Sequence, residues 1–116
     1  MSTGDKLPHV DEAYVESAKL ADYLLSSTHP DGKGKAEFFI AFGFSASEIE
    51  QMKTALVLHG LERSVVQVLG TEHGVKYVVE CSIVTPDARN PCVRSVWIVD
   101  TAKTAPRFVT AYPNQV

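Results

Sequence analysis

The stretch CVRSVWIV, residues 92–99, decides the fold class, because its side chains alternate as they do along a β-strand. Successive residues of a strand point to opposite faces of the sheet. One face carries Val93, Ser95, Trp97 and Val99, and the other face carries Arg94, Val96 and Ile98. Both faces are partly apolar, so we expect one to meet helices and the other to form a partly covered cleft.

Three further runs rich in β-branched and aromatic residues surround this stretch: Val65–Leu69, Lys76–Ile83 and Arg107–Tyr112. The turn-forming stretches GTEHG, TPDARNP and DTAKTAP separate the runs. Close spacing of this kind predicts a four-stranded antiparallel β-meander. Within the last run, alternation predicts that Phe108, Thr110 and Tyr112 share one face, with Arg107 and Val109 on the other.

Helical spacing of apolar residues dominates the chain before residue 60. It predicts helices over about 17–26 and 35–42, then a third that ends at Gly60. The third begins near a Ser45–Glu48 capping box, with Ser47–Glu50 as a second possible register. The side chains expected to pack on the sheet are Leu20, Leu24, Phe38, Phe39, Ile49 and Met52. Helices followed by strands predict an α+β fold, with two or three N-terminal helices on one sheet face.

Chain length, net charge and the length of apolar runs limit the class of protein. A chain of 116 residues fits a single domain, residues 1–116, with residues 1–10 a poorly ordered lead-in and a core over about 17–113. The net charge of -3 argues against a strongly basic nucleic-acid binder. The N-terminus lacks the apolar segment of a secretory signal, and no run is long enough to span a membrane, so we expect a cytoplasmic protein.

Two cysteines, Cys81 and Cys92, are too few for a disulfide framework or a cysteine zinc site. They could lie opposite each other on a hairpin, but a cytoplasmic location favours reduced, buried thiols. No paired-ligand motif such as HExxH occurs, so we expect no metal and no cofactor.

The stretch STHPDGKGKAEFF, residues 27–39, is the first candidate site. His29 has a side chain suited to general acid–base catalysis, or it is a loop histidine at a helix end. Lys33 and Lys35, beside two glycines and a helix start, could hold phosphate, or the glycines only turn the chain between helices. The Walker spacing is absent because Ala36 follows Lys35, which argues against a nucleoside-triphosphate site.

The strands supply a second group of candidates. Arg94 and Arg107 lie on neighbouring expected strands, where two guanidinium groups can bind phosphate, unless they are surface charges paired with groups such as Glu80. Thr110 and Tyr112 could orient or stack a base, or could simply pack. Tyr23, near His29, has the same two interpretations.

The combination of KLADYLLSSTHPDGKGKAEFF, VRSVWIVD and PRFVTAYP, within residues 19–113, resembles a bacterial family known only as a domain of unknown function. Members of that family occur alone or at the ends of large bacterial toxin proteins. The resemblance therefore implies a link to toxin–immunity or toxin–antitoxin modules. The order of helices and strands also looks like the barnase/EndoU/RelE-like group of ribonuclease toxins, which cut RNA on an open sheet face.

Together these features lead to two functional hypotheses. The first is a metal-independent endoribonuclease-like toxin domain, with His29, Arg94, Arg107 and Tyr112 catalytic. In this hypothesis Lys33, Lys35, Thr110 and Tyr23 bind the RNA substrate. The second is a non-catalytic binding module, an immunity or antitoxin type of partner that uses the open sheet face. Convergence of His29, the arginines and Tyr112 in one cleft would favour the enzyme, whereas the acidic chain favours the binding module.

Overall fold

The computed structural model describes residues 7–9, 12–20, 33–45 and 47–113. Its elements follow the expected order of helices and then strands. They are α1 (Ser17–Lys19), α2 (Lys33–Ala41), α3 (Ile49–Glu62), β1 (Ser64–Thr71), β2 (Gly74–Ser82), β3 (Cys92–Asp100) and β4 (Arg107–Pro113). The strands form one antiparallel sheet in the order β1-β2-β3-β4. The α+β class and the four-stranded meander are thus confirmed.

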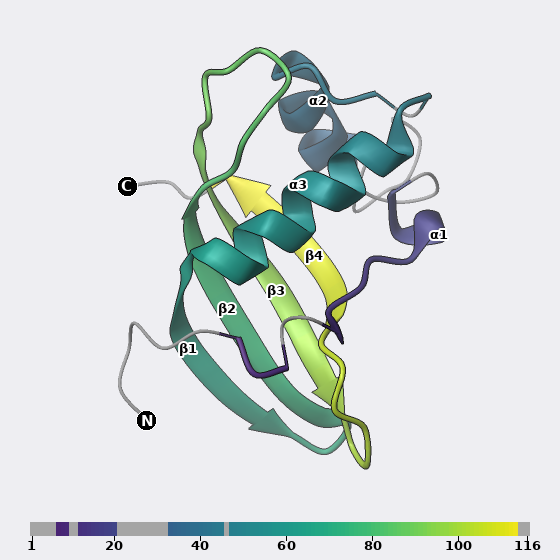
Figure 1. The fold of residues 1–116 in the computed structure, drawn as a ribbon, viewed down its shortest axis with the longest axis vertical. Helices are drawn as coiled ribbons and strands as arrows, with labels where there is room; N and C mark the ends of the chain where they lie inside the picture. Colours follow the sequence, from purple (N-terminus) through teal and green to yellow (C-terminus); the bar gives the residue numbers. More distant parts are fainter. Residues whose placement is uncertain (1–6, 10–11, 21–32, 46, 114–116) are drawn as a thin grey trace.

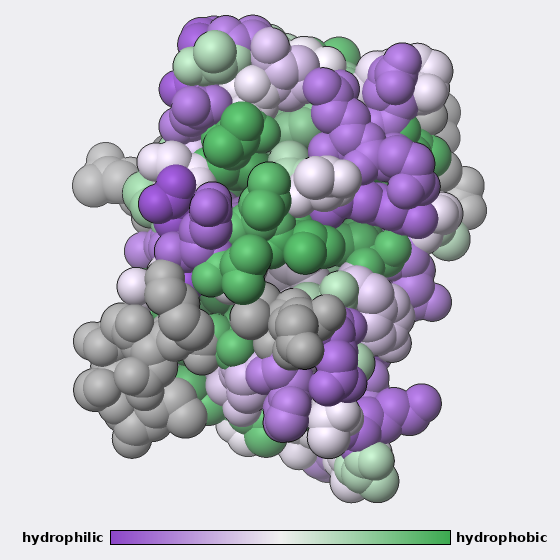
Figure 2. Space-filling model, in the orientation of Figure 1, coloured by the Kyte–Doolittle hydropathy of each residue, from purple (hydrophilic) through white to green (hydrophobic). Residues whose placement is uncertain are grey.

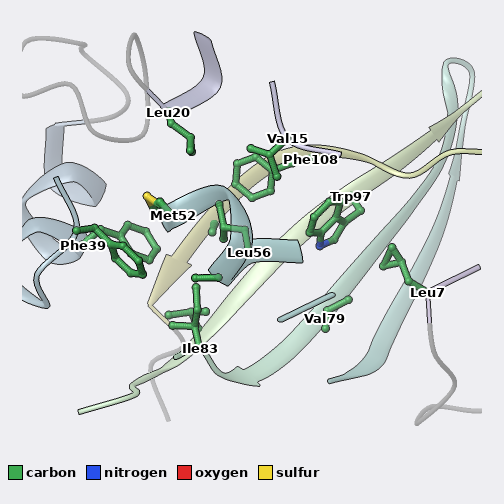
Figure 3. Packing of buried hydrophobic residues seen from close by; sticks show 14 of the residues in the cluster. Leu7, Val15, Leu20, Phe39, Met52, Leu56, Val79, Ile83, Trp97 and Phe108 are labelled. Atoms are coloured by element: carbon green, nitrogen blue, oxygen red, sulfur yellow. The ribbon is translucent and has the colours of Figure 1, made fainter. Parts of the chain in front are cut away.

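The helix α3 lies across one face of the sheet, and α2 packs beside it near the end of β4 (Figure 1). The space between α3 and the sheet holds the hydrophobic core, into which Trp97, Phe108 and Leu56 point (Figure 3). The Trp97 and Phe108 rings meet edge to face, with centroids 5.5 Å apart. We call this side of the sheet the helix face and the opposite side the outer face.

Burial agrees with most of the expected core. Leu20, Phe39 and Met52 are fully buried, while Phe38 and Ile49 are half-buried and pack against the cluster. Leu24 and most of the expected 17–26 helix lie outside the described residues. Leu7 is also buried in this cluster, although it lies in the stretch expected to be a lead-in.

The third helix departs from the sequence prediction at both ends. Its N-cap residue is Glu48, whose side chain makes no capping bond, while Ser45 Oγ accepts a hydrogen bond from the Ser47 backbone N–H. The expected capping box is therefore wrong. The helix also continues through Gly60 to Glu62. A Cβ at Gly60 would lie 3.1 Å from Cζ2 of Trp97, so the missing side chain lets the helix approach the tryptophan.

A β-bulge changes the faces of β4. Trp97 pairs with Phe108, but its neighbour Val96 pairs with Thr110, so the register shifts by one residue at Val109. Phe108 is therefore buried on the helix face, while Thr110 and Tyr112 lie on the outer face with Val96 and Arg94. The expectation that Phe108, Thr110 and Tyr112 share one face is wrong, because alternation ignores the extra residue of a bulge.

The prediction of reduced, buried cysteines is also wrong. Cys81 and Cys92 form a disulfide between β2 and β3, with Cα atoms 4.3 Å apart, and Cys81 is exposed. The bond closes the β2–β3 loop of residues 83–91. This loop docks on α2, where Arg89 donates to the Ala41 carbonyl at 2.7 Å and its guanidinium lies over the Phe42 ring. Register brings the two cysteines together across neighbouring strands, which composition does not indicate.

Candidate functional site

Five polar side chains gather where the outer face meets the edge of β4, and we call them the Arg94 cluster. They come from α2, β2, β3 and β4, and they are Lys35, Glu80, Arg94, Thr110 and Tyr112. The strands bring three of them into one row, because Glu80 pairs with Arg94 and Arg94 pairs with Tyr112. Four of the five were expected as site residues, and the structure brings these four together.

Charge within the cluster is balanced around Arg94. Its Nε donates to Oε2 of Glu80 across the two strands, with the arginine side chain 41% exposed and the glutamate 20% exposed. Hydrogen bonding to Glu80, and then to Tyr112, raises the pKa of Arg94 above its ordinary value. The guanidinium therefore stays positive at any working pH, but a carboxylate already neutralises part of its charge.

Lys35 joins this row from α2. Its Nζ donates to Oγ1 of Thr110 at 3.2 Å and lies 6.0 Å from the centre of the Tyr112 ring. An ammonium within about 6 Å of an aromatic ring is attracted to the ring face. The contact ties the first turns of α2 to β4, so one of the two lysines considered for phosphate binding reaches the sheet.

Arg107 lies elsewhere on the sheet. It pairs with Ile98, whereas Tyr112 pairs with Arg94 at the other end of the ladder between β3 and β4. Two of its nitrogens donate to the two carboxylate oxygens of Asp100, at 3.0 and 3.1 Å. This bidentate pair lowers the pKa of Asp100 below its ordinary range. Arg107 is therefore engaged in its own ion pair and does not join Arg94.

Three of the expected site residues have no described side chain. His29 and Tyr23 lie outside the described residues. Lys33 begins the backbone of α2, and its side chain is not described. The convergence of His29 with Arg94 and Tyr112 thus stays a prediction.

A buried hydrogen-bond chain under α3 was not expected as a feature of the fold. His59 is 2% exposed, with Nε2 2.8 Å from the Cys81 carbonyl and Nδ1 2.8 Å from Ser95 Oγ. A carbonyl only accepts, so Nε2 carries the proton and donates it. Trp97 Nε1 donates to Ser95 Oγ at 2.8 Å, and the Ser95 hydroxyl is then free to donate to Nδ1.

These hydrogen bonds give both ring nitrogens of a neutral His59 a partner and disfavour the charged imidazolium. Burial lowers the pKa of His59 below its ordinary value, and the hydrogen bond to the Cys81 carbonyl only partly offsets this. His59 therefore has a structural role that joins α3 to β2 and β3. A signal for it exists in the sequence, because His59 follows Leu56 by three positions and Met52 by seven, on the buried stripe of the helix.

Folding stability should fall as the pH drops below the ordinary histidine pKa of about 6.5, because the unfolded chain binds a proton that the buried imidazole resists. This contribution is fully present above that pH and is lost in the window below it. Urea unfolding at several pH values between about 7.5 and 5 measures the slope. His59→Gln keeps a donor and an acceptor without titrating, so it should flatten the slope, and equal slopes in both proteins would contradict the assignment.

Two apolar hollows flank Leu58 on the exposed side of α3. Leu58 and Thr54 line both of them. The β2–β3 loop, through Val84 and Pro86, helps to wall the hollow beside Phe44, whose volume is about 310 Å³. Figure 2 shows apolar side chains gathered across the middle of this face, over α3. Neither of these two hollows includes a residue of the Arg94 cluster.

The described part of the chain holds neither a cluster of metal-ligating side chains nor a membrane-spanning helix. Residues 7–9, 12–20, 33–45 and 47–113 contain no group of three or more His, Cys, Asp or Glu side chains that could hold a metal ion. Within the same residues, no helix has the length and apolar character needed to cross a bilayer.

The sequence matches the family model described as a domain of unknown function, DUF6883, over residues 6–115. The chain belongs to this family. The DUF6883 chain also resembles a chain of a solved structure, a contact-dependent growth inhibition toxin–immunity protein complex from Klebsiella pneumoniae 342. The TM-score is 0.61 at 19% identity, over 92% of this chain and 97% of that chain. At such identity the likeness shows a shared fold.

These matches bear on the resemblances expected from the sequence. The expected membership of a family of unknown function agrees with the DUF6883 match, and the expected link to toxin modules stays a prediction. Likeness to the barnase/EndoU/RelE group stays a prediction. No curated protein sequence matches the DUF6883 chain.

Proposed function

We propose that this chain is a non-catalytic binding module of the immunity type, which binds a toxin domain through the Arg94 cluster. The observation that carries the proposal is the state of the two arginines. Arg94 is paired with Glu80 and Arg107 with Asp100, so each guanidinium already has a carboxylate partner. A phosphodiester would have to compete with both carboxylates, whereas a protein surface of mixed charge can add to such pairs.

The chemistry of the cluster suits recognition of a protein. Arginine and tyrosine are the residues most enriched among side chains that dominate binding energy at interfaces. Here Arg94 and Tyr112 are adjacent, and Lys35 and Glu80 supply opposite charges on either side. The solved structure with the same fold is itself a complex of a toxin with its immunity protein, which supports a partner of this class.

Arg94→Ala should weaken binding of a cognate toxin domain by about 30-fold, equivalent to about 2 kcal/mol. Titration calorimetry on the purified pair measures the change. Tyr112→Phe removes only the hydroxyl and should weaken binding less. Lys103→Ala, an exposed residue in the turn after β3, is the matched control and should leave affinity unchanged.

The absence of any complex between the wild-type proteins, or affinity unchanged in Arg94→Ala, would contradict the proposal. Circular dichroism of each variant separates lost binding from lost folding. Since the cluster is partly exposed, we expect all three variants to fold.

An endoribonuclease-like toxin domain is the second candidate, and one observation favours it. Lys35, Thr110, Tyr112 and Arg94 converge as a cationic substrate-binding group would. In that mechanism His29 would exchange protons with the ribose hydroxyl or the leaving oxygen, and Lys35 and Arg94 would stabilise phosphate charge. Cleavage of labelled RNA by the wild-type chain, lost in His29→Ala and Lys35→Ala, would establish this function in place of the first.

A further inference from the structure

The two edges of the sheet are covered differently. At the β4 edge, the Tyr14 backbone makes two hydrogen bonds. Its N–H donates to the Pro106 carbonyl at 3.1 Å, and its carbonyl accepts from the Phe108 N–H at 3.0 Å. At β1, none of the described segments other than β2 pairs with the strand. Among the residues that the structure describes, the outward N–H and C=O groups of β1 thus have no strand partner, as at an open sheet edge.

The exposed part of β1 is apolar and uncharged. The strand reads SVVQVLGT, without a charged residue or proline, and every residue from Gln67 to Thr71 is exposed. Val68 and Leu69 are 40% and 44% exposed. Edge strands usually carry lysine, proline or other features that prevent pairing, and here the only such feature is a bulge at Val66.

The charges at the two ends of β1 indicate what fits it. Arg63 precedes the strand and Glu72 follows it, so the ends carry opposite charges. If a second copy of β1 pairs antiparallel about Val68, with Val65 and Val66 filling one ladder position at the bulge, Arg63 of each copy lies opposite Glu72 of the other. The same charge match occurs twice, as the isologous interface of a twofold dimer requires.

We propose that β1 is a self-association surface, at which two copies of this chain pair antiparallel and join their sheets. Burial of Val68 and Leu69 and new backbone hydrogen bonds stabilise the pair. In this register the bulge at Val66 of each copy interrupts the ladder on either side of Val68, so the interface is short and the dimer weak. This surface lies on the opposite edge from the Arg94 cluster and does not depend on the proposed function.

Sedimentation velocity of the full chain tests the proposal. Raising the concentration from about 10 μM to about 1 mM should shift the mass from 12.7 kDa toward twice that value. Glu72→Arg places arginine opposite arginine at both ends and should weaken association at least about tenfold. The double variant Arg63→Glu, Glu72→Arg restores opposite charges and should recover association. Lys103→Glu, in the turn after β3, is the control for a change of net charge.

Arg63 also donates to the Ser82 carbonyl at 3.0 Å, so the double variant is checked for folding by circular dichroism. Val68→Lys, which leaves that bond intact, provides a second disruption of the edge and should also give a monomer. A wild-type chain that stays monomeric throughout, or equal association of wild type and Glu72→Arg, would overturn the proposal. A monomer whose binding to the toxin domain weakens in Glu72→Arg would also overturn it, and would assign the edge to that partner.

Discussion

Phe39→Ala should lower the free energy of unfolding by about 3–5 kcal/mol, because it removes a fully buried ring from the contact between α2 and the sheet. The ring meets Phe38 edge on, with centroids 5.1 Å apart, and lies 6.1 Å from the ring of Phe44. Truncation leaves a cavity among these aromatic side chains, which cannot close without moving α2. Urea denaturation monitored by circular dichroism measures the loss.

The next residue provides the control. Ile40 is 47% exposed on the other side of the same helix, so Ile40→Ala should cost well under the loss at Phe39. Similar losses at both positions would mean that burial of the Phe39 ring does not determine the effect, since alanine has the higher helix propensity at either position. A loss below about 1 kcal/mol at Phe39 would contradict the helix register itself.

Removal of the Cys81–Cys92 disulfide should lower the free energy of unfolding by about 2–3 kcal/mol in non-reducing buffer. The two cysteines are 11 positions apart, so the bond closes a short loop in the unfolded chain and restricts its conformations. The variant Cys81→Ser, Cys92→Ser should still fold, because both strands keep their ladder and the loop keeps its contacts with α2. We expect the β2–β3 loop to become the first segment to exchange its amide protons.

Reduction of the wild-type chain with dithiothreitol should reproduce this loss, while the serine variant should be insensitive to the reagent. A thiol assay on protein purified without oxidant or reductant gives the direct count of free thiols. Two free thiols per chain would contradict the disulfide. Since disulfides are typical of oxidising compartments, the same assay on protein from cells also tests the predicted cytoplasmic location.

The placement of the Arg94 cluster shows how far reasoning from sequence reached at the site. Lys35, Arg94, Thr110 and Tyr112 were chosen for their chemistry, and contacts through α2 and the sheet bring them together. Arg107 was chosen on the same chemical grounds, yet Asp100 holds it at the other end of the ladder. Side-chain chemistry is a property of each residue, whereas the partner of an arginine depends on which strand register places a carboxylate beside it.

The sequence by itself determined the helices-then-strands order and which side chains of β3 share a face, because both follow from the local period of apolar residues. Only the tertiary structure decided the bulge that turns Thr110 and Tyr112 to the outer face, the passage of α3 through Gly60 and the disulfide. It also decided that His59 bonds to Ser95 and Cys81, residues 36 and 22 positions away. Each of these depends on contacts between segments distant in the chain. A local sequence pattern does not predict such contacts, because they form only when α3 packs on the sheet.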